Sequence, residues 1–167
     1  FLPIVVDKNI ENLNLYDSQN KIKDLFFALS HGVNSGKLKQ GKYDEREKFI
    51  NKLINKYPSI KYNILGHFGE QPKWNYEFYE EISKCKMALN LSRGHPLKYT
   101  SSNRIASLIG NGIYTFIDKK TKFNDFFDEN EVGFYNNIDD LGSKIENLLK
   151  FPNKIKEYSR NGKIKYF

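Results

Sequence analysis

Short apolar runs alternate with longer amphipathic stretches along this chain. Runs of strand length stand at residues 24–30, 60–65, 87–91, 113–117 and 132–135. Nearly continuous apolar segments of this length are typical of strands that are covered on both faces. Apolar residues recur at helical spacing at residues 43–57, 74–85, 103–109 and 138–149, and Pro152 stands at the first turn of a terminal helix. This alternation predicts an α/β domain built around a parallel sheet.

The segment 86–118 indicates how neighbouring strands are connected. An apolar run is followed by a polar loop, a cluster of helix N-cap residues at 101–103, a short amphipathic helix, the tripeptide Gly-Asn-Gly and a second apolar run. Strand, helix and strand in this order form a right-handed parallel unit. Five such strands predict a doubly wound, Rossmann-like three-layer fold with a five-stranded parallel sheet in the order 2-1-3-4-5. The switch point then lies between the first and third strands, so loops 30–42 and 92–102 flank one crevice.

Aromatic residues are plentiful, and their spacing predicts where two groups of them lie. Trp74, Phe78 and Ile82 recur at four-residue intervals, which predicts that this side of the helix faces the core. Residues 121–128 predict a short helix whose inward-facing aromatics are Phe123, Phe126 and Phe127.

The chain length of 167 residues suits one domain with an extended segment before it. Residues 1–23 start with an apolar, Pro-containing stretch and continue without periodicity, which indicates an interdomain linker before an α/β domain at 24–167. The single Cys85 precedes a buried strand and has no partner for an internal disulfide, which suits a core position in a reducing compartment. No apolar run has membrane-spanning length, so a cytoplasmic location is expected.

Lysine gives the chain most of its net charge of +7. Most lysines alternate with Asn, Glu and Asp on helix faces that are predicted to be solvated, which favours a general bias toward Lys and Asn. The alternative is an anionic partner, such as a nucleotide or phospholipid headgroups. Arg-rich clusters and RNA-binding aromatic motifs are absent, which argues against nucleic acid. The lysine-rich faces also allow weak peripheral contact with an anionic membrane.

Cationic and hydroxyl side chains gather at the predicted crevice. Its edge carries Lys37, Lys39, Lys42, Arg46, Arg93, His95, Lys98 and Arg104. Ser101 and Ser102 add hydroxyls beside the helix that begins near Asn103, and a helix N-terminus flanked by cations suits a diphosphate. No carboxylate pair, metal-spaced Cys/His cluster or nucleophile elbow stands there. The crevice is therefore predicted to bind and stabilise a departing phosphate rather than to hydrolyse a substrate alone.

Three features of the crevice edge leave two interpretations open. The glycine-rich loop that contains Gly32 fits neither the Walker loop nor the Gly-x-Gly-x-x-Gly fingerprint, so it is either an ordinary loop or a phosphate cradle. Arg46 either contacts a ligand or pairs with a neighbouring Glu. His67 follows a strand end, where ligand groups often lie, but no catalytic partner is identifiable for it.

The order of these features resembles that of a known family. The segment SKCKMALNLSRGHPLKYTSSNRIASLIGNGIYTFID is similar to the C-terminal, donor-binding domain of GT-B glycosyltransferases of group 1, especially the CgeB-like group. In that family a strand ending near Leu-Asn is followed by a loop, then Ser-Ser-x-Arg opening a helix, then a Gly before the next strand. The run FNDFFDENEVGFYNNIDDLGSKIENLLKFPNKIKEYSRNGKIKYF also resembles it, with an Asp-Leu helix and a Pro-started terminal helix.

The resemblance implies a domain that binds a nucleotide-diphosphate sugar as a substrate, without a metal or a further cofactor. An N-terminal domain would bring a saccharide or lipid-linked acceptor and the catalytic base, with cell-envelope polysaccharide as the expected product. Arg104 and Arg93 would stabilise the leaving group. The other residues expected to contact the donor are Gly32, Gly66, His67, Ser101, Ser102 and Asn103, with Gly66 and His67 beside the base.

One departure from the family pattern affects this expectation. Many retaining GT-B enzymes carry two glutamates eight residues apart, and the position that matches the second lies near Ser107. No Glu occurs between Glu81 and Glu129, so the ribose or sugar must be held differently. The alternatives are a non-catalytic flavodoxin-like module and a degenerate transferase domain that binds a nucleotide or a protein partner.

Overall fold

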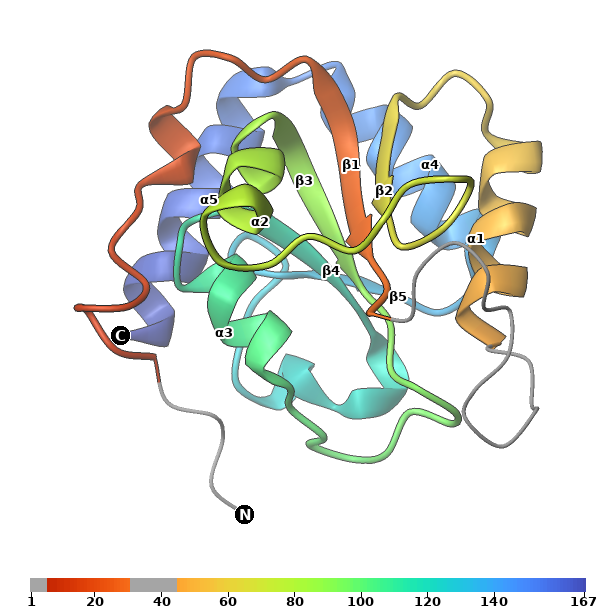
Figure 1. Cartoon of the computed structure of the whole chain (residues 1–167). Helices are drawn as coiled ribbons and strands as arrows, with labels where there is room; N and C mark the ends of the chain where they lie inside the picture. The colour runs from red at the N-terminus through yellow and green to blue at the C-terminus, as the bar shows by residue number, and fades with distance from the viewer. Residues whose placement is uncertain (1–5, 31–44) are drawn as a thin grey trace.

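The computed structural model describes residues 6–30 and 45–167 (Figure 1). Within this part of the chain, five parallel strands form one sheet in the order β2-β1-β3-β4-β5. The strands are β1 (Lys23–Ala28), β2 (Tyr62–Leu65), β3 (Cys85–Asn90), β4 (Tyr114–Asp118) and β5 (Gly133–Tyr135). The strand order predicted from the sequence is therefore confirmed.

Helices cover both faces of the sheet, because alternate residues of each strand point to opposite sides. The helices are α1 (Glu45–Lys56), α2 (Asn75–Ser83), α3 (Asn103–Ile109), α4 (Ile138–Leu149) and α5 (Pro152–Tyr166). Odd-numbered residues of β1 and β3 pack against α1 and α4 in a cluster that includes Leu25, Phe27, Met87, Leu89, Ile50, Leu53, Leu141 and Ile145. Even-numbered residues pack against α2 and α3 in a cluster that includes Phe26, Ala28, Ala88, Ile82 and Leu108. This is the predicted three-layer arrangement.

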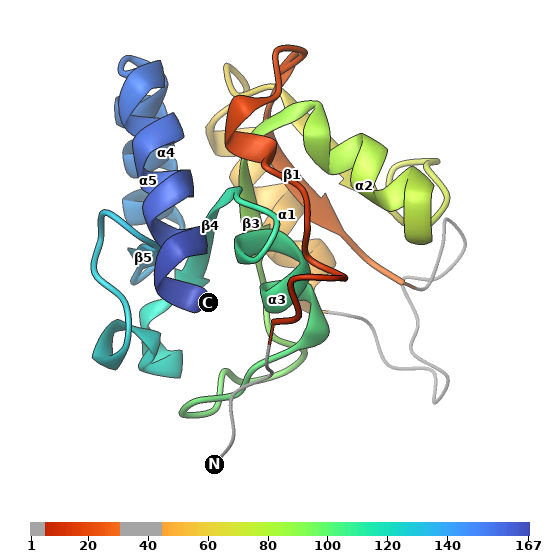
Figure 2. The same cartoon turned by 90° about the vertical axis from the view of Figure 1, so that its left-hand side faces the viewer.

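The segment before β1 is packed against the domain. It contains one turn of 3-10 helix, η1 (Leu15–Asp17), and Leu15 is buried in the core on the α2–α3 side. The backbone N–H of Leu13 donates to Oδ1 of Asn111 at 3.0 Å, and the N–H of Leu15 donates to the Asn111 carbonyl oxygen at 2.9 Å. Figure 2 shows the segment running alongside α3 and α5. Its role as an interdomain linker stays a prediction, and residues 1–5 lie outside the described residues.

Two predicted aromatic positions are wrong. Trp74 is 61 % exposed, because α2 begins one residue later and Trp74 has extended backbone at the N-cap position. In place of one helix over 121–128 the chain forms two 3-10 turns, η2 (Lys119–Thr121) and η3 (Phe123–Asp125). Lys122 separates them with a left-handed φ of +61°, and an α-helix does not continue through this conformation. Phe126 is consequently 49 % exposed, whereas the other two aromatics predicted there are buried.

We expect Asn111→Ala to lower the free energy of unfolding by about 2 kcal/mol, because it leaves partly buried backbone groups without partners. Besides accepting from Leu13, the Asn111 amide donates to the Ser107 carbonyl at 2.8 Å, and the side chain is fully buried. Urea denaturation measures the change. Asn12→Ala is the matched control, since this exposed amide bonds only the Asn9 carbonyl, and we expect it to change stability by less than about 0.5 kcal/mol. Equal effects of the two substitutions would contradict the anchoring role of Asn111.

Candidate functional site

Two hollows meet where β1 and β3 end, at the switch point of the sheet. The first has a volume of about 450 Å³ and lies between the end of β3, the loop that follows it, α1 and α3. The second, of about 420 Å³, lies between the end of β1, the start of α2 and α3. Asn103 and Arg104, at the start of α3, line both. Hollows are therefore present at the edge of the sheet where the crevice is expected, whereas Lys37, Lys39 and Lys42 of its other loop fall outside the described residues.

Three arginines and a histidine line the first hollow, without any carboxylate among the described lining residues. Arg46, Arg93, His95 and Arg104 contribute to it from three different elements. Arg46 is buried although it is charged, and it stands in the first turn of α1. Both Arg46 and Arg104 also have interaction partners within the protein. An anion in this hollow would meet guanidinium groups from several directions, which suits bidentate binding of phosphate.

Arg104 joins the two hollows. It is the second residue of α3, and its guanidinium carbon lies 5.8 Å from the centre of the Phe27 ring of β1. The carboxylates considered as alternative ion-pair partners of Arg104 are Asp118 and Asp125. The carboxylate of Asp118 accepts from the N–H of Lys120, and that of Asp125 accepts from the hydroxyl of Tyr99. Arg104 thus stands in the wall of both hollows, and its contact with a bound anion stays a prediction.

The expected capping of α3 by serine hydroxyls is not observed. Ser102 occupies the N-cap position with extended backbone, but its side chain makes no capping hydrogen bond, and its buried Oγ has no partner. Ser102 and Asn103 line the first hollow, whereas Ser101 lines neither hollow. Because α3 has only seven residues, its dipole is small, and the arginines carry more of the positive potential than the sequence pattern suggests.

Asn90 is a residue of the site that was not among those predicted. It is the last residue of β3, and only 5 % of its surface is exposed to solvent. Its Oδ1 has no hydrogen-bond partner among the described residues. An unpartnered buried acceptor costs about 1–3 kcal/mol, and Asn90 stands in the wall of the first hollow. The signal in the sequence is a polar residue that ends an otherwise apolar strand at the carboxyl edge.

The remaining predicted residues lie elsewhere or outside the described residues. Gly32 falls in 31–44, which the structure does not describe. Gly66 has a φ of +77°, and a Cβ there would lie 2.2 Å from the Leu29 carbonyl oxygen, so backbone packing alone requires glycine. Nε2 of His67 lies 3.0 Å from Oδ1 of Asn51, and neither Gly66 nor His67 lines the two hollows. Their contact with a nucleotide base stays a prediction.

The second hollow has an aromatic wall made by Trp74, Phe78 and Tyr79 at the start of α2. Glu81 fixes the chain that leads into this wall: its carboxylate accepts from Lys73 Nζ at 2.7 Å and from Asn63 Nδ2 at 2.9 Å. Burial alone would raise the pKa of Glu81, but the hydrogen bonds from Lys73, Asn63 and Lys84 outweigh it and lower this pKa to about 2.

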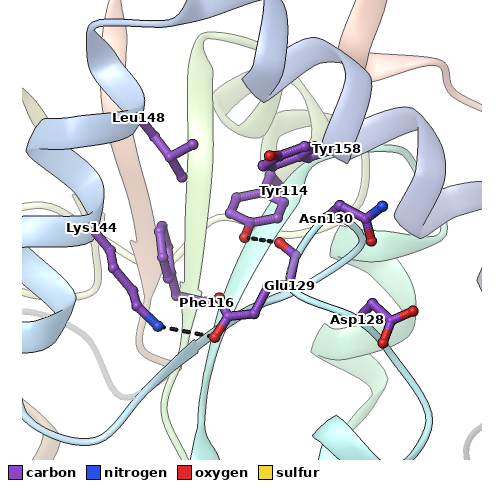
Figure 3. A pocket seen from close by; sticks show the side chains of 8 residues that line it. All are labelled: Tyr114, Phe116, Asp128, Glu129, Asn130, Lys144, Leu148 and Tyr158. Carbon is purple, nitrogen blue, oxygen red and sulfur yellow. Dashed lines mark hydrogen bonds and ion pairs between the residues drawn. The ribbon is translucent and has the colours of Figure 1, made fainter.

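A third hollow, of about 550 Å³, lies near the amino end of β4 between the sheet and α4 (Figure 3). The Tyr114 hydroxyl donates to the Glu129 carbonyl oxygen at 2.6 Å, and Lys144 Nζ lies 3.0 Å from Glu129 Oε1. Phe116 and Tyr114 line it but are almost inaccessible to solvent. None of the sequence-predicted site residues lies there, so this hollow is not the candidate site, although it is the largest of these three.

Residues 6–30 and 45–167 contain no candidate metal site. No group of three His, Cys, Asp or Glu side chains there is placed to hold a metal ion. In the same part of the chain, none of the helices combines the length and the apolar character that crossing a bilayer requires.

Comparisons with known proteins agree with this geometry. A family model described as "Glycosyl transferase-like" matches residues 45–167, well over half of the chain. A sucrose-phosphate synthase from Thermosynechococcus elongatus has a similar structure, with a TM-score of 0.55 and 15 % identity over 98 % of this chain and 40 % of that one. The structure of TarM is also similar, with a TM-score of 0.59 and 13 % identity over 100 % of this chain and 34 % of that one. The chain thus spans well under half of these proteins. A search of curated proteins gave no significant match.

We expect Glu81→Gln to lower the free energy of unfolding at pH 7 by about 1–2 kcal/mol, a value reduced for the partial exposure of the lysines. The folded-state pKa of Glu81 lies below its ordinary value of 4.5, so its stabilisation is present above pH 4.5 and is lost as the pH falls toward 2. Urea denaturation of both proteins between pH 7 and pH 3 measures this.

Glu80→Gln is the control for Glu81→Gln, since Glu80 is half exposed and pairs only with Lys84 at 3.1 Å. We expect it to change stability by less than about 0.5 kcal/mol. A stability difference between Glu81→Gln and the unsubstituted protein that stayed constant down to pH 3 would show that charge is not the cause.

Proposed function

The chain belongs to this glycosyl transferase-like family, and from this premise we propose that it is the donor-binding domain of a GT-B glycosyltransferase. In this proposal a nucleotide-diphosphate sugar occupies the crevice at the ends of β1 and β3. The observation that carries the proposal is the convergence of Arg46, Arg93 and Arg104 on a hollow lined by no carboxylate among the described residues. Ligands of doubly wound folds bind at this switch point.

The arginines supply the part of the chemistry that this domain can perform. When the acceptor hydroxyl attacks the anomeric carbon, the bond between that carbon and the phosphate oxygen breaks, and negative charge develops on the departing nucleoside diphosphate. Arg104 and Arg93 are placed to stabilise that charge through directed hydrogen bonds. A metal ion is not required in this scheme, since guanidinium groups supply the positive charge.

The two hollows suit different parts of the donor. The first, with its arginines and the buried amide of Asn90, suits the diphosphate and the sugar. The second offers the exposed face of Trp74, on which a nucleobase can stack, and the small polar side chain of Ser107. Ser107 stands where the resemblance places a glutamate, so neutral hydrogen bonds from Asn103 and Ser107 would hold the ribose.

The acceptor and the catalytic base are assigned to a further domain. No carboxylate lines either hollow among the described residues, so no general base faces the donor there. The solved structures that this chain resembles are more than twice as long as the part it matches, which leaves room for such a domain. We propose a saccharide or lipid-linked acceptor, a role in cell-envelope polysaccharide synthesis in the cytoplasm, and no sugar transfer by this domain alone.

A degenerate module that binds a nucleotide without transferring a sugar is the second candidate function. The absence of glutamates between Glu81 and Glu129 is the observation that favours it. Donor turnover by the protein together with its acceptor-binding domain separates the two, since the degenerate module would bind the donor and leave it intact.

We expect Arg104→Ala to weaken binding of UDP or GDP by about 1.5–3 kcal/mol, the scale of a hydrogen bond to a charged group. Arg104→Lys should restore only part of the affinity, because Lys offers a point charge rather than a planar fork. NMR titration suits the dissociation constant of about 0.1–1 mM expected for half of a two-domain cleft.

Arg160→Ala is the control for Arg104→Ala, because Arg160 is exposed on α5 and lines neither hollow. Thermal unfolding of each variant is measured alongside nucleotide binding. An Arg104→Ala protein that was destabilised but bound nucleotide normally would overturn the assignment.

We expect Asn90→Leu to separate binding from stability. It removes a buried acceptor that has no partner, so the free energy of unfolding should stay the same or rise by about 1 kcal/mol. Nucleotide affinity should fall at least about threefold, since a ligand hydrogen bond is worth about 0.5–1.5 kcal/mol. Urea denaturation and NMR titration measure the two. A less stable variant with unchanged affinity would make Asn90 a structural residue only.

A further inference from the structure

Two neighbouring loops at the carboxyl edge of the sheet carry exposed apolar side chains and exposed lysines. The loop after β3 carries Leu97, which is 67 % exposed, and the turns after β4 carry Phe126, which is 49 % exposed. Both loops lie at the bottom of Figure 1. We name this surface the lysine-rich tip, and its members are Leu97, Phe126, Lys98, Lys119, Lys120 and Lys122.

Tyr99 joins the two loops into one surface. Its backbone N–H donates to the Thr121 carbonyl oxygen at 2.7 Å, and its hydroxyl donates to Asp125 Oδ2 at 2.7 Å. The Tyr99 ring lies 5.1 Å from that of Phe126, and Phe126 also packs edge-on against Phe123 at 6.3 Å. Phe126 is therefore held in place by two rings while half of it faces solvent.

The tip carries carboxylates as well as lysines, and the two are not paired with one another in the described residues. The four lysines are exposed, and none has a carboxylate partner among the described residues; Lys98 lies over the Tyr99 ring, with its Nζ 4.6 Å from the ring centre. Asp118 accepts from the backbone N–H of Lys120 at 2.8 Å, and Asp125 accepts from Tyr99. The carboxylates thus secure the loops, and the ammonium groups stand at the surface.

We propose that the lysine-rich tip binds the surface of an anionic phospholipid bilayer. Leu97 and Phe126 enter the boundary between headgroups and acyl chains, and the four lysines contact the headgroup phosphates. Exposed apolar side chains beside lysines are complementary to such a surface, because insertion of the apolar groups and electrostatic attraction both favour binding. This inference goes beyond the proposed function and needs no donor chemistry. If the proposed function also holds, the first hollow would open beside the bilayer, because Leu97 lines that hollow as well.

Flotation of the chain with vesicles tests the proposal. We expect binding to vesicles of phosphatidylcholine with about 30 % phosphatidylglycerol at low salt, and much weaker binding to phosphatidylcholine alone or at high salt. Neutralising Lys119, Lys120 and Lys122 to Gln should weaken binding on the order of 100-fold, at about fivefold per lysine. Leu97→Ser with Phe126→Ser should weaken it at least about tenfold, and thermal unfolding verifies that both variants are folded.

The chain offers a matched control at the junction of α4 and α5. Phe151 is 52 % exposed and is flanked by Lys150 and Lys154, with Lys154 Nζ 5.1 Å from its ring centre. We expect Phe151→Ser with both lysines changed to Gln to leave vesicle binding unchanged. Loss of binding in this control equal to the loss in the tip variants would overturn the proposal. Absence of binding to anionic vesicles at low salt would overturn it as well.

Fluorescence locates the inserted residue. Trp74 is the single Trp, so Phe126→Trp combined with Trp74→Phe places the only indole in the tip. We expect a blue shift on addition of anionic vesicles and quenching by brominated acyl chains. Unchanged emission from a protein that floats with vesicles would overturn the proposed insertion. Equally tight binding to soluble polyphosphate, dependent on the lysines but not on Leu97 and Phe126, would assign a soluble polyanion instead of a bilayer.

Discussion

The opposite directions of the first two crossovers, from β1 to β2 and from β2 to β3, control the rest of this structure. β1 pairs with β2 on one side and with β3 on the other, so the first crossover runs one way across the sheet and the second runs the other way. Because parallel crossovers are right-handed, α1 and α2 must then lie on opposite faces. The chain cannot fill the gap that this leaves at the ends of β1 and β3, and both hollows of the candidate site lie there. Cavity formation is thus a consequence of strand order rather than of any particular side chain.

Side chains decide what this gap can bind. Arg46 is buried at the start of α1, and Arg93 and Arg104 reach the same hollow from the loop after β3 and from α3. Like charges around one hollow repel each other, and a buried amide oxygen without a partner adds to this cost. Arg46 and Arg104 also have interaction partners within the protein. Buried charge that lowers stability is typical of binding sites.

Much of the fold could be predicted from the sequence, and the failures share one cause. Hydrophobic periodicity identified the strands and their order, and it identified the helix at 138–149, which the structure shows capped by Oδ1 of Asn137 accepting from two backbone N–H groups. Periodicity does not show where a helix begins, so it placed the exposed Trp74 in the core. It also could not show the left-handed turn at Lys122 that leaves Phe126 exposed. Both residues lie at element ends, where local backbone conformation outweighs the pattern, and both lie beside surfaces with an inferred function.

The loop after β3 connects these surfaces. It supplies Arg93 and His95 to the first hollow and Leu97 and Lys98 to the lysine-rich tip, within a few residues of one another. Tyr99 ties the loop to the turns after β4 through both its backbone and its hydroxyl. A ligand that fixes the loop in one position therefore reduces the conformational entropy that the loop loses when a second ligand binds to it. This coupling acts equally in both directions. Binding at the hollow and binding at the tip would then favour each other through this one short segment, without any change in the sheet.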